Sequence, residues 1–387
     1  MAEKRFLVTL AMAMAMAMAT ATALVAGGAT VAQGDPGPTF VDPTVTMVRP
    51  AEVHLGSLVY VGPYATLIAG MPIHVGDESD LQDSVLLSAR TGPVDLGEQS
   101  IMAHGSAAKD GAEIGERGTC PGGAGHCPSF VGFNSEVDGG IVERDAMVLH
   151  LARVGPGVRI PSGRKVLSGK NVVTQAQVAS KTAPVTEADR LFMHGVIEVN
   201  VSFAHGYSML AAESPSNVRG INYDPGGTAF NPVRNLPTLA GVPTRDPAAN
   251  ARIIGDVRMA DNAILTRQIV RSSLRADEGE PFHVGTVDSM GTNVTFHALE
   301  HSHLDLGDHG RYGNGAVVHG GPAFSATTSS ASGLTLGRSA VLFQSQVGDQ
   351  VTIGSRSLVQ ASRLAAGTVV PENTVVVDGV VAGRVEW

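Results

Sequence analysis

Aliphatic residues recur along this chain in short units, each followed by glycine. The units run through both halves of the sequence, at Val75-Gly76, Leu96-Gly97, Val131-Gly132, Val284-Gly285 and Ile353-Gly354. Between them, small or aliphatic residues return about every six positions, a spacing that does not fit the helical period. A parallel β-helix explains the pattern, because each face of a triangular coil takes one hexapeptide whose aliphatic residue stacks on its equivalents in neighbouring coils. We expect the small residue to let the chain turn at each corner.

The pattern predicts two tandem copies of such a coil. Residues 33–212 form the first copy and residues 251–387 the second, while residues 213–250 are rich in Pro, Gly and Asn and predict a linker. A helix is expected over residues 186–212, lying along the first coil, with Thr186 as its N-cap. The predicted fold class is therefore all-β, with two parallel β-helices and one α-helix after the first.

The composition favours the same narrow, regularly turned β structure. Hydrophobic residues make up 43% of the 387, but only 4% are aromatic, and there are 47 glycines. A glycine-rich β-sandwich is the alternative, which the scarcity of regularly spaced hairpin dipeptides disfavours. The net charge of -9 comes without any basic stripe, which argues against nucleic acid as a partner.

The N-terminus has the features of a secretory signal. Lys4 and Arg5 precede an apolar run from Phe6 to Ala26, and small residues follow. We expect residues 1–32 to be a signal peptide, which makes the protein secreted, periplasmic or attached to the cell surface. The alternative is an uncleaved anchor, and only in that case would the membrane be a partner.

Two cysteines bracket a loop rich in Gly and Pro, at Cys120 and Cys127. In an oxidising compartment this spacing favours a disulfide that closes the loop. A metal site made of both thiolates and His126 is the alternative, but it lacks a fourth ligand nearby.

Candidate chemistry gathers in the second copy. His297, His319 and Glu300 lie among the aliphatic-Gly units, close in sequence to acidic residues. Two imidazoles with nearby carboxylates on a rigid scaffold suit a metal-activated water. A further cluster could hold a second metal, although a solvated acidic loop is the simpler interpretation; it contains His301, His303, His309, Asp305 and Asp308.

Several segments resemble the gamma-class carbonic anhydrases, a family of left-handed parallel β-helices. In the second copy these are "LRADEGEPFHVG", "VTFHALE", "GNGAVVHG" and "VLFQSQVG", and in the first "LGEQSIMAHGSAAKDGAEIG", "FVGFNSEV" and "IPSGRKVLSG". The resemblance covers most of the chain, as two diverged copies. It implies a homotrimer with zinc between neighbouring β-helices, iron or cobalt being other possible metals. The implied activity is the reversible hydration of carbon dioxide to bicarbonate by zinc-bound hydroxide.

The family holds its metal with three histidines, two from one subunit and one from the next. Neither copy keeps all three positions, which are Ser88, His104 and Lys109 in the first and His297, Asn314 and His319 in the second. The losses are complementary, so a site between one face of each copy would contain His104, His297 and His319. Another alignment places Phe324 at the last position and removes this mixed site.

The resemblance also implies roles for other residues. Glu300 matches the proton shuttle, and Glu278, in the acidic turn with Arg275 and Asp277, could relay protons as well. Gln82 and Asn200 would orient hydroxide or substrate by hydrogen bonds. In the first copy the acidic turn is replaced, on this alignment, by Thr66, Ile68 and Ala69.

Two other functions compete with the carbonic anhydrase interpretation. One is a non-catalytic trimerising β-helix scaffold that has lost its metal site. The other is a hexapeptide-repeat acyltransferase, which the acidic turn and the "HALE" segment disfavour.

Overall fold

The first half of the chain winds through three sheets, here called A, B and C. The computed structural model describes residues 37–226, 233–260, 268–278, 280–321 and 327–387. Sheet A contains β1 (Phe40–Val41), β4 (Tyr60–Val61), β7 (Asp80–Leu81), β10 (Ser100–Met102), β13 (Ser129–Val131), β16 (Met147–Val148), β19 (Arg164–Val166) and, antiparallel, β21 (Thr182–Pro184). Sheet B contains β2 (Thr46–Val48), β5 (Thr66–Ala69), β8 (Leu86–Ala89), β11 (Ala107–Lys109), β14 (Glu136–Asp138), β17 (Arg153–Val154) and β20 (Asn171–Val172). Sheet C contains β3 (Val53–Leu55), β6 (Ile73–Val75), β9 (Val94–Leu96), β12 (Glu113–Ile114), β15 (Ile141–Val142) and β18 (Arg159–Ile160).

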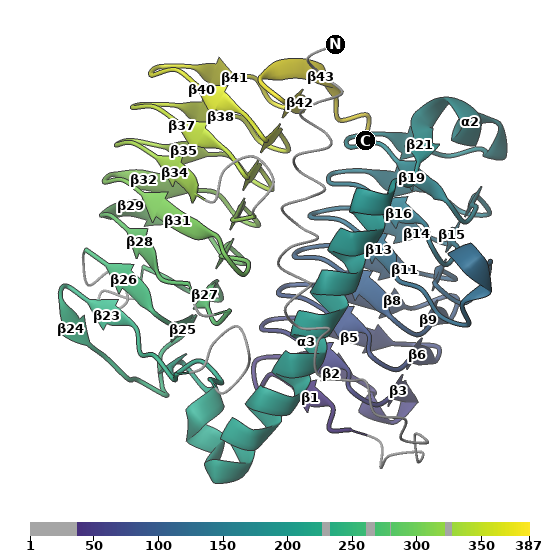
Figure 1. Ribbon diagram of the computed structural model, residues 1–387, viewed down its shortest axis with the longest axis horizontal. Helices are drawn as coiled ribbons and strands as arrows, with labels where there is room; N and C mark the ends of the chain where they lie inside the picture. Colours follow the sequence, from purple (N-terminus) through teal and green to yellow (C-terminus); the bar gives the residue numbers. More distant parts are fainter. Residues whose placement is uncertain (1–36, 227–232, 261–267, 279, 322–326) are drawn as a thin grey trace. The chain divides into compact units, whose positions relative to one another are not determined.

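The second half repeats this plan in sheets D, E and F. Sheet D contains β22 (Ile221–Asn222), β25 (Arg252–Gly255), β27 (Ser273–Ala276), β30 (Thr295–His297), β33 (Val317–His319), β36 (Val341–Phe343), β39 (Leu358–Gln360), β42 (Thr374–Val377) and, antiparallel, β43 (Val380–Arg384). Sheet E contains β23 (Thr238–Leu239), β24 (Val242–Pro243), β26 (Val257–Met259), β28 (Phe282–Val284), β31 (His303–Leu306), β34 (Thr327–Ser330), β37 (Gln346–Val347) and β40 (Arg363–Leu364). Sheet F contains β29 (Val287–Met290), β32 (Gly310–Tyr312), β35 (Thr335–Leu336), β38 (Thr352–Ile353) and β41 (Val369–Val370). The predicted pair of tandem left-handed parallel β-helices is confirmed (Figure 1).

Columns of aliphatic side chains fill each coil. In sheet B, Leu67 pairs with Leu87, which pairs with Ala108, and the column continues through Val137 and Val154, all fully buried. Each strand contributes one inward residue at the same register, so a short apolar unit repeated in sequence stacks into a continuous core.

The glycines of the aliphatic-Gly units are explained by close approach of the backbone rather than by turn conformation. A Cβ on Gly97 would lie 2.3 Å from the carbonyl oxygen of Gly115, and one on Gly76 would lie 2.5 Å from the amide nitrogen of Glu98. The left-handed backbone at corners is instead often adopted by other residues, such as Ser84 and Asn134. The expected role of the small residue is therefore corrected: it leaves room for the next coil.

The helix that follows the first coil is α3 (Glu187–Glu213), which confirms the expected helix and its N-cap. The Thr186 side chain accepts a hydrogen bond from the Asp189 amide, and the Asp189 carboxylate accepts one from the Thr186 amide in return. The helix contacts β1, β4 and β10 and runs along sheet A (Figure 1). Short helical pieces precede or follow these elements, namely η2 (Pro50–Glu52), η3 (Pro121–Gly123), η4 (Gln175–Gln177), α2 (Val178–Lys181) and η5 (Pro215–Val218).

The segment predicted as a linker, 213–250, contributes strands to the second coil. Within it, β22 pairs with β25 and β23 pairs with β26, so the second coil begins at Ile221 rather than at 251. Neither strand carries an aliphatic-Gly unit, the signal that marks other two-residue strands such as β38 at Ile353-Gly354. Burial of Ile221 and Leu239 fastens them to the core.

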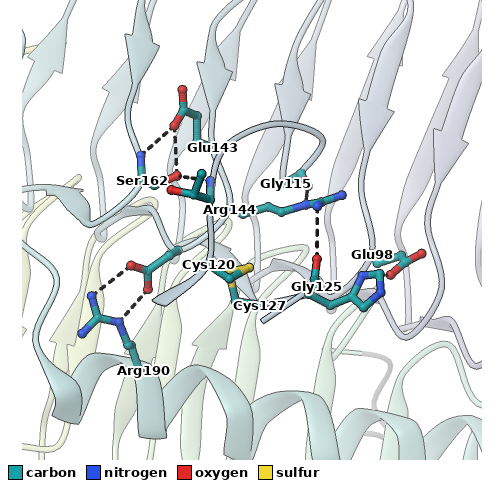
Figure 2. The surroundings of a disulfide bond; sticks show 12 residues. Glu98, Gly115, Cys120, Gly125, Cys127, Glu143, Arg144, Ser162 and Arg190 are labelled. Atoms are coloured by element: carbon teal, nitrogen blue, oxygen red, sulfur yellow. Dashed lines mark hydrogen bonds and ion pairs between the residues drawn. A yellow bond between two sulfur atoms is a disulfide. The ribbon is translucent and has the colours of Figure 1, made fainter. Parts of the chain in front are cut away.

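The predicted disulfide is confirmed between Cys120 and Cys127, seven residues apart. Figure 2 shows that Arg144 lies beside the loop; its Nε donates to the carbonyl of Gly115 at 2.9 Å and its Nη1 to that of Gly125 at 3.3 Å. His126 forms an ion pair with Glu98. The loop is thus closed covalently and held by its neighbours, and its cysteines are not free to bind metal.

Side chains from both coils form a shared apolar cluster, because sheet A of the first coil faces sheet D of the second. The cluster combines residues from sheet A and its turns, from α3 and from sheet D: Ile101, Phe130, Phe133, Met147, Met193, Ile197, Val317, Val341, Phe343 and Leu358. Residues 38–387 form one compact unit, which brings the faces of the two copies together. The predicted signal peptide, residues 1–32, lies outside the described residues. In the described parts of the chain, no helix has the length and apolarity to cross a membrane.

Candidate metal centre

His297 and His319 stand side by side on the outward face of sheet D. They are directly opposite each other on the parallel strands β30 and β33, and Arg275 on β27 and Phe343 on β36 continue the same column. Neighbouring parallel strands lie about 4.8 Å apart, which places two imidazoles within reach of one ion. The register thus brings together two residues that are 22 positions apart in sequence.

His104 reaches the same place from the first coil, in the turn after β10. Its Nε2 lies 3.3 Å from Nδ1 of His297, and that Nδ1 lies 3.3 Å from Nε2 of His319. One ring nitrogen of each histidine lies within 4.8 Å of the other two, and all three side chains are buried. All three members of the set come from one chain.

The equivalent positions agree with the alignment that pairs His319 with Lys109. Lys109 pairs with Ser88 on neighbouring strands in sheet B, as His319 pairs with His297 in sheet D. Phe324, the alternative partner, lies outside the described residues. Ile68 pairs with Ser88, so Ile68 rather than Thr66 stands where Arg275 stands in the second coil, a correction of two positions.

The outer nitrogen of each histidine faces an oxygen. His104 Nδ1 lies 2.8 Å from Asp83 Oδ2, and His319 Nδ1 lies 2.7 Å from the carbonyl oxygen of Gly320. His297 Nε2 lies 3.3 Å from Asp277 Oδ1 and 3.2 Å from Glu278 Oε1. An acceptor at the outer nitrogen favours the proton there, so the lone pair of the inner nitrogen points towards the common centre.

The three imidazoles differ in their affinity for protons. Burial lowers the pKa of His104 to about 4, against the opposing effect of Asp83, and burial together with the charge of His297 holds the pKa of His319 well below its usual range. Burial and Arg275 lower the pKa of His297, but Asp277 and Glu278 outweigh them and raise it to about 9. A cation entering the site therefore meets two neutral imidazoles and displaces a proton at the third.

The donor set fits a divalent transition metal. Ligands about 2.0–2.1 Å from a tetrahedral zinc ion are separated from each other by roughly 3.3–3.4 Å, and His297 Nδ1 lies 3.3 Å from the inner nitrogens of His104 and His319. Without a cation, the inner lone pairs of His104 and His319 would converge on the protonated His297 in a buried site. Three neutral imidazoles with acceptors behind them match the catalytic type of zinc site, which keeps a fourth position for water or substrate.

A buried ion-pair network joins the two coils behind the histidines. Arg275 Nη2 lies 3.1 Å from Asp83 Oδ2, and Arg275 Nη1 contacts Asp277 Oδ2 at 2.8 Å and the Tyr60 hydroxyl at 2.7 Å. Tyr207 on α3 donates a hydrogen bond to Asp277. Although burial raises it, the pKa of Asp83 stays below its usual range because Arg275 and His104 lie beside the carboxylate. Arg275 and Asp277 form an ion pair within the second coil, and Asp83 extends it across the two copies.

Two of the other predicted residues lie around this centre. Glu278 contacts His297 and accepts a hydrogen bond from the Glu300 amide at 2.6 Å. Gln82 is buried beside His104; its Oε1 accepts from the His104 amide at 3.3 Å, and its Nε2 donates to Asp80 at 2.8 Å.

The remaining predictions fall at the edge of the site or away from it. Glu300 is partly exposed and pairs with His301. The Asn200 amide donates to the carbonyl of Val196 within α3 at 2.7 Å, a hydrogen bond that stays inside the helix. Asn314 is in the turn before β33, where its Oδ1 accepts from the Thr292 amide at 3.0 Å.

The corresponding position in the first coil holds an ion-pair network instead of a ligand. Lys109 pairs with Glu136, which also accepts from Arg153 at 2.9 Å, and Arg153 contacts Asp138 at 2.7 Å. Lys109, which the resemblance places where a ligand histidine would stand, is thus compensated by the carboxylate of Glu136.

An aromatic wall beside the histidines was not anticipated. The centroid of the Phe133 ring lies 4.7 Å from that of the His319 ring and 4.5 Å from that of the His150 ring, on which it stacks. The Phe343 ring packs edge-on against His319, with 5.6 Å between the ring centroids. His150 is buried, accepts from the Phe133 amide, and has a pKa lowered to about 3 by burial. Phe343 could have been found from its position, because it directly follows His319 in the column of outward-facing residues.

The second histidine cluster does not form one site. His301 and His303 approach Glu280, whereas His309 lies 3.0 Å from Asp288. Among the described residues, His104, His297 and His319 are the one group whose geometry could hold a metal ion.

No family model matches the chain. It is 28% identical over 188 residues to the carboxysome assembly protein CcmM of Nostoc sp., a match that covers 45% of this chain and only 31% of the length of that protein. Among solved structures, a hexapeptide transferase family protein from Anaplasma phagocytophilum aligns over 43% of this chain and 91% of its own, with 19% identity and a TM-score of 0.32.

A second curated relative is a carbonic anhydrase from Methanosarcina thermophila, of the gamma class. The two sequences are 30% identical over 193 residues, which covers 43% of this chain and 72% of the relative. This coverage, together with the two coils described above, places the protein: the chain belongs to the gamma-class carbonic anhydrase family.

Proposed function

We propose that the protein catalyses the reversible hydration of carbon dioxide to bicarbonate at the centre between its two coils. The observation that carries the proposal is the convergence of three inner nitrogens within 4.8 Å of one another, each backed by an oxygen at the outer nitrogen; two of the three separations are 3.3 Å. His104, His297 and His319 would hold zinc, with iron or cobalt as other candidates. Zinc bound there would lower the pKa of a coordinated water from about 15.7 to about 7.

The chain's own residues hold and orient this centre. Asp83 and the Gly320 carbonyl fix the rings of His104 and His319, and Glu278 with Asp277 fixes that of His297. Arg275 joins the two carboxylates that belong to different coils. The rigid network favours one arrangement of the imidazoles, which reduces the reorganisation needed during turnover.

The reaction needs one set of side chains to transfer protons and another to orient the substrate. Each hydration event releases a proton, and Glu278 with Glu300 would accept it and pass it outward. Gln82, buried beside His104, would orient water or substrate. The Asn200 amide donates to Val196 within α3, so a similar role for Asn200 rests on the family resemblance alone. Phe133 and Phe343 give the site an apolar wall, which suits uncharged carbon dioxide and keeps bulk water away.

The proposal extends to assembly and location. A homotrimer is expected from the family resemblance, although the three imidazoles already come from one chain and so need no partner subunit. A secreted, periplasmic or cell-surface location is supported by the Cys120–Cys127 disulfide, since such bonds persist in oxidising compartments.

Metal analysis combined with carbon dioxide hydration tests the function. Protein purified and reloaded with zinc should contain about one metal per chain, and His297→Ala and His104→Ala should each lose the metal and the activity. His309→Ala, an exposed histidine that pairs with Asp288, serves as the matched control and should keep both. A metal-free wild type that cannot be reloaded would favour the scaffold alternative, and loss of metal in His297→Ala but not in His104→Ala would contradict the mixed site.

A further inference from the structure

A line of carboxylates and imidazoles leads from the buried centre to the surface. Glu278 contacts His297 with one oxygen and accepts from the Glu300 amide with the other. Glu300 Oε1 lies 2.8 Å from His301 Nε2, and His301 Nδ1 lies 3.8 Å from Glu280 Oε1. Along this line the exposed fraction of the side chain rises from 3% at Glu278 to 30% at Glu300 and 68% at His301.

Burial and the neighbouring carboxylates raise the pKa of the Glu300 carboxyl group, which suits it to proton transfer. Partial burial raises its pKa, and the carboxylates of Glu278, Glu198 on α3 and Glu280 raise it further, while His301 opposes them. A carboxyl group with a raised pKa gives up a proton less readily to dilute base, so a positioned acceptor at its outer oxygen speeds release. His301 supplies the nearest imidazole nitrogen.

We propose that His301 is the proton-relay residue that connects Glu300 to solvent. In the step, the Glu300 Oε1–H bond breaks and a His301 Nε2–H bond forms; the proton on Nδ1 then leaves to a base in solution. The imidazole returns to its starting tautomer by exchanging protons with water or by rotation of the ring. Charge and protons balance at each stage, and no oxidant or reductant is involved.

The inference rests on the proposed function, because the reaction supplies the proton, and it adds a residue that the family resemblance did not assign. The groups that face His301 are Glu300 and Glu280, with His303 sharing the contact to Glu280 at 3.5 Å. The His301 imidazole contacts the Glu300 carboxylate and is exposed, so it can exchange protons with buffer.

The test uses His301→Asn in the full chain loaded with zinc. In dilute buffer the maximal hydration rate should fall by about tenfold while kcat/KM stays unchanged, because proton export follows the interconversion of carbon dioxide and bicarbonate. Added imidazole should restore the rate of the variant more than that of the wild type. His309→Asn, with a comparable exposed histidine bound to Asp288, should behave as the wild type.

A second measurement does not depend on activity. In metal-free protein, the carboxyl carbon of Glu300 followed by NMR titration should show a higher pKa in His301→Asn than in the wild type, because the charge that opposes its rise is removed. After reloading, the zinc content should be equal in the variant and the wild type. An unchanged rate and unchanged Glu300 titration in an active protein would overturn the relay alone. A zinc-loaded wild type without hydration activity would overturn the proposed function and the relay with it.

Discussion

Arg275 of the second coil lies 3.1 Å from Asp83 of the first, and both side chains are almost completely buried. The same Asp83 oxygen lies 2.8 Å from His104 Nδ1. The Asp83 carboxylate that joins the two copies therefore also orients one of the three imidazoles. Association of the coils and assembly of the candidate metal centre depend on one carboxylate.

Replacement of Arg275 by methionine should destabilise the protein strongly. It leaves Asp83 and Asp277 buried without their cation, and breaking a buried ion pair in this way costs about 3–5 kcal/mol. Urea unfolding at pH 7 measures the loss. Arg258→Met removes an exposed arginine paired with Asp256 and should cost less than about 1 kcal/mol. Equal losses in the two variants would show that the network does not stabilise the interface.

Replacement of Asp83 by asparagine should weaken metal binding by about 10- to 100-fold, because a neutral amide behind His104 lowers the basicity of the ligand. Competition with a chelator measures the affinity. Asp80→Asn is the matched control: burial raises the pKa of Asp80 well above its usual range, and its carboxyl group accepts from Gln82 rather than standing behind a histidine ring, so the substitution should change the metal affinity less. An affinity unaffected by Asp83→Asn would rule out its role in orienting His104.

Removal of the disulfide should affect stability but not the metal. Closing a loop of seven residues between Cys120 and Cys127 restricts the unfolded chain by about 2 kcal/mol, which Cys120→Ser with Cys127→Ser should remove. Thermal unfolding under non-reducing conditions measures the difference, and zinc content should match that of the wild type. A loss of zinc would mean that the loop supports the centre through β13 and Phe133.

The C-terminal Glu386 should stabilise the protein in a pH-dependent way. It bonds Lys170 at 2.9 Å and Lys181 at 2.8 Å, and although burial raises its pKa, these partners and the Asn171 amide lower it from 4.5 to about 2. The folded state therefore binds this proton less readily than the unfolded state. The contribution is full above about pH 4.5 and is lost as the pH falls towards 2.

The Glu386→Gln variant gives the matching measurement. At pH 7 it should be less stable than the wild type by up to about 1 kcal/mol, because the ion pairs are partly exposed. The gap should narrow in urea titrations repeated at pH 4 and pH 3. If the difference in the free energy of unfolding between the two proteins grew on acidification, this role for Glu386 would be excluded.

The sequence by itself determined the coils, the helix and the disulfide. A β-helix needs only that an aliphatic residue recur at the same register, and a capping box or a cysteine pair is a local feature, so all three are visible along the chain. The short strands at Ile221 and Thr238 were missed because neither carries an aliphatic-Gly unit.

Only the tertiary structure decided how the chemistry is arranged. The family resemblance named His104, His297 and His319, but whether they meet depends on which faces of the two coils pack together, and this follows from the apolar cluster shared by sheets A and D. The acceptors behind each imidazole, the cation at Arg275 and the contact between Glu300 and His301 come from distant parts of the chain. Their effect depends on distance and burial, which a linear pattern does not contain.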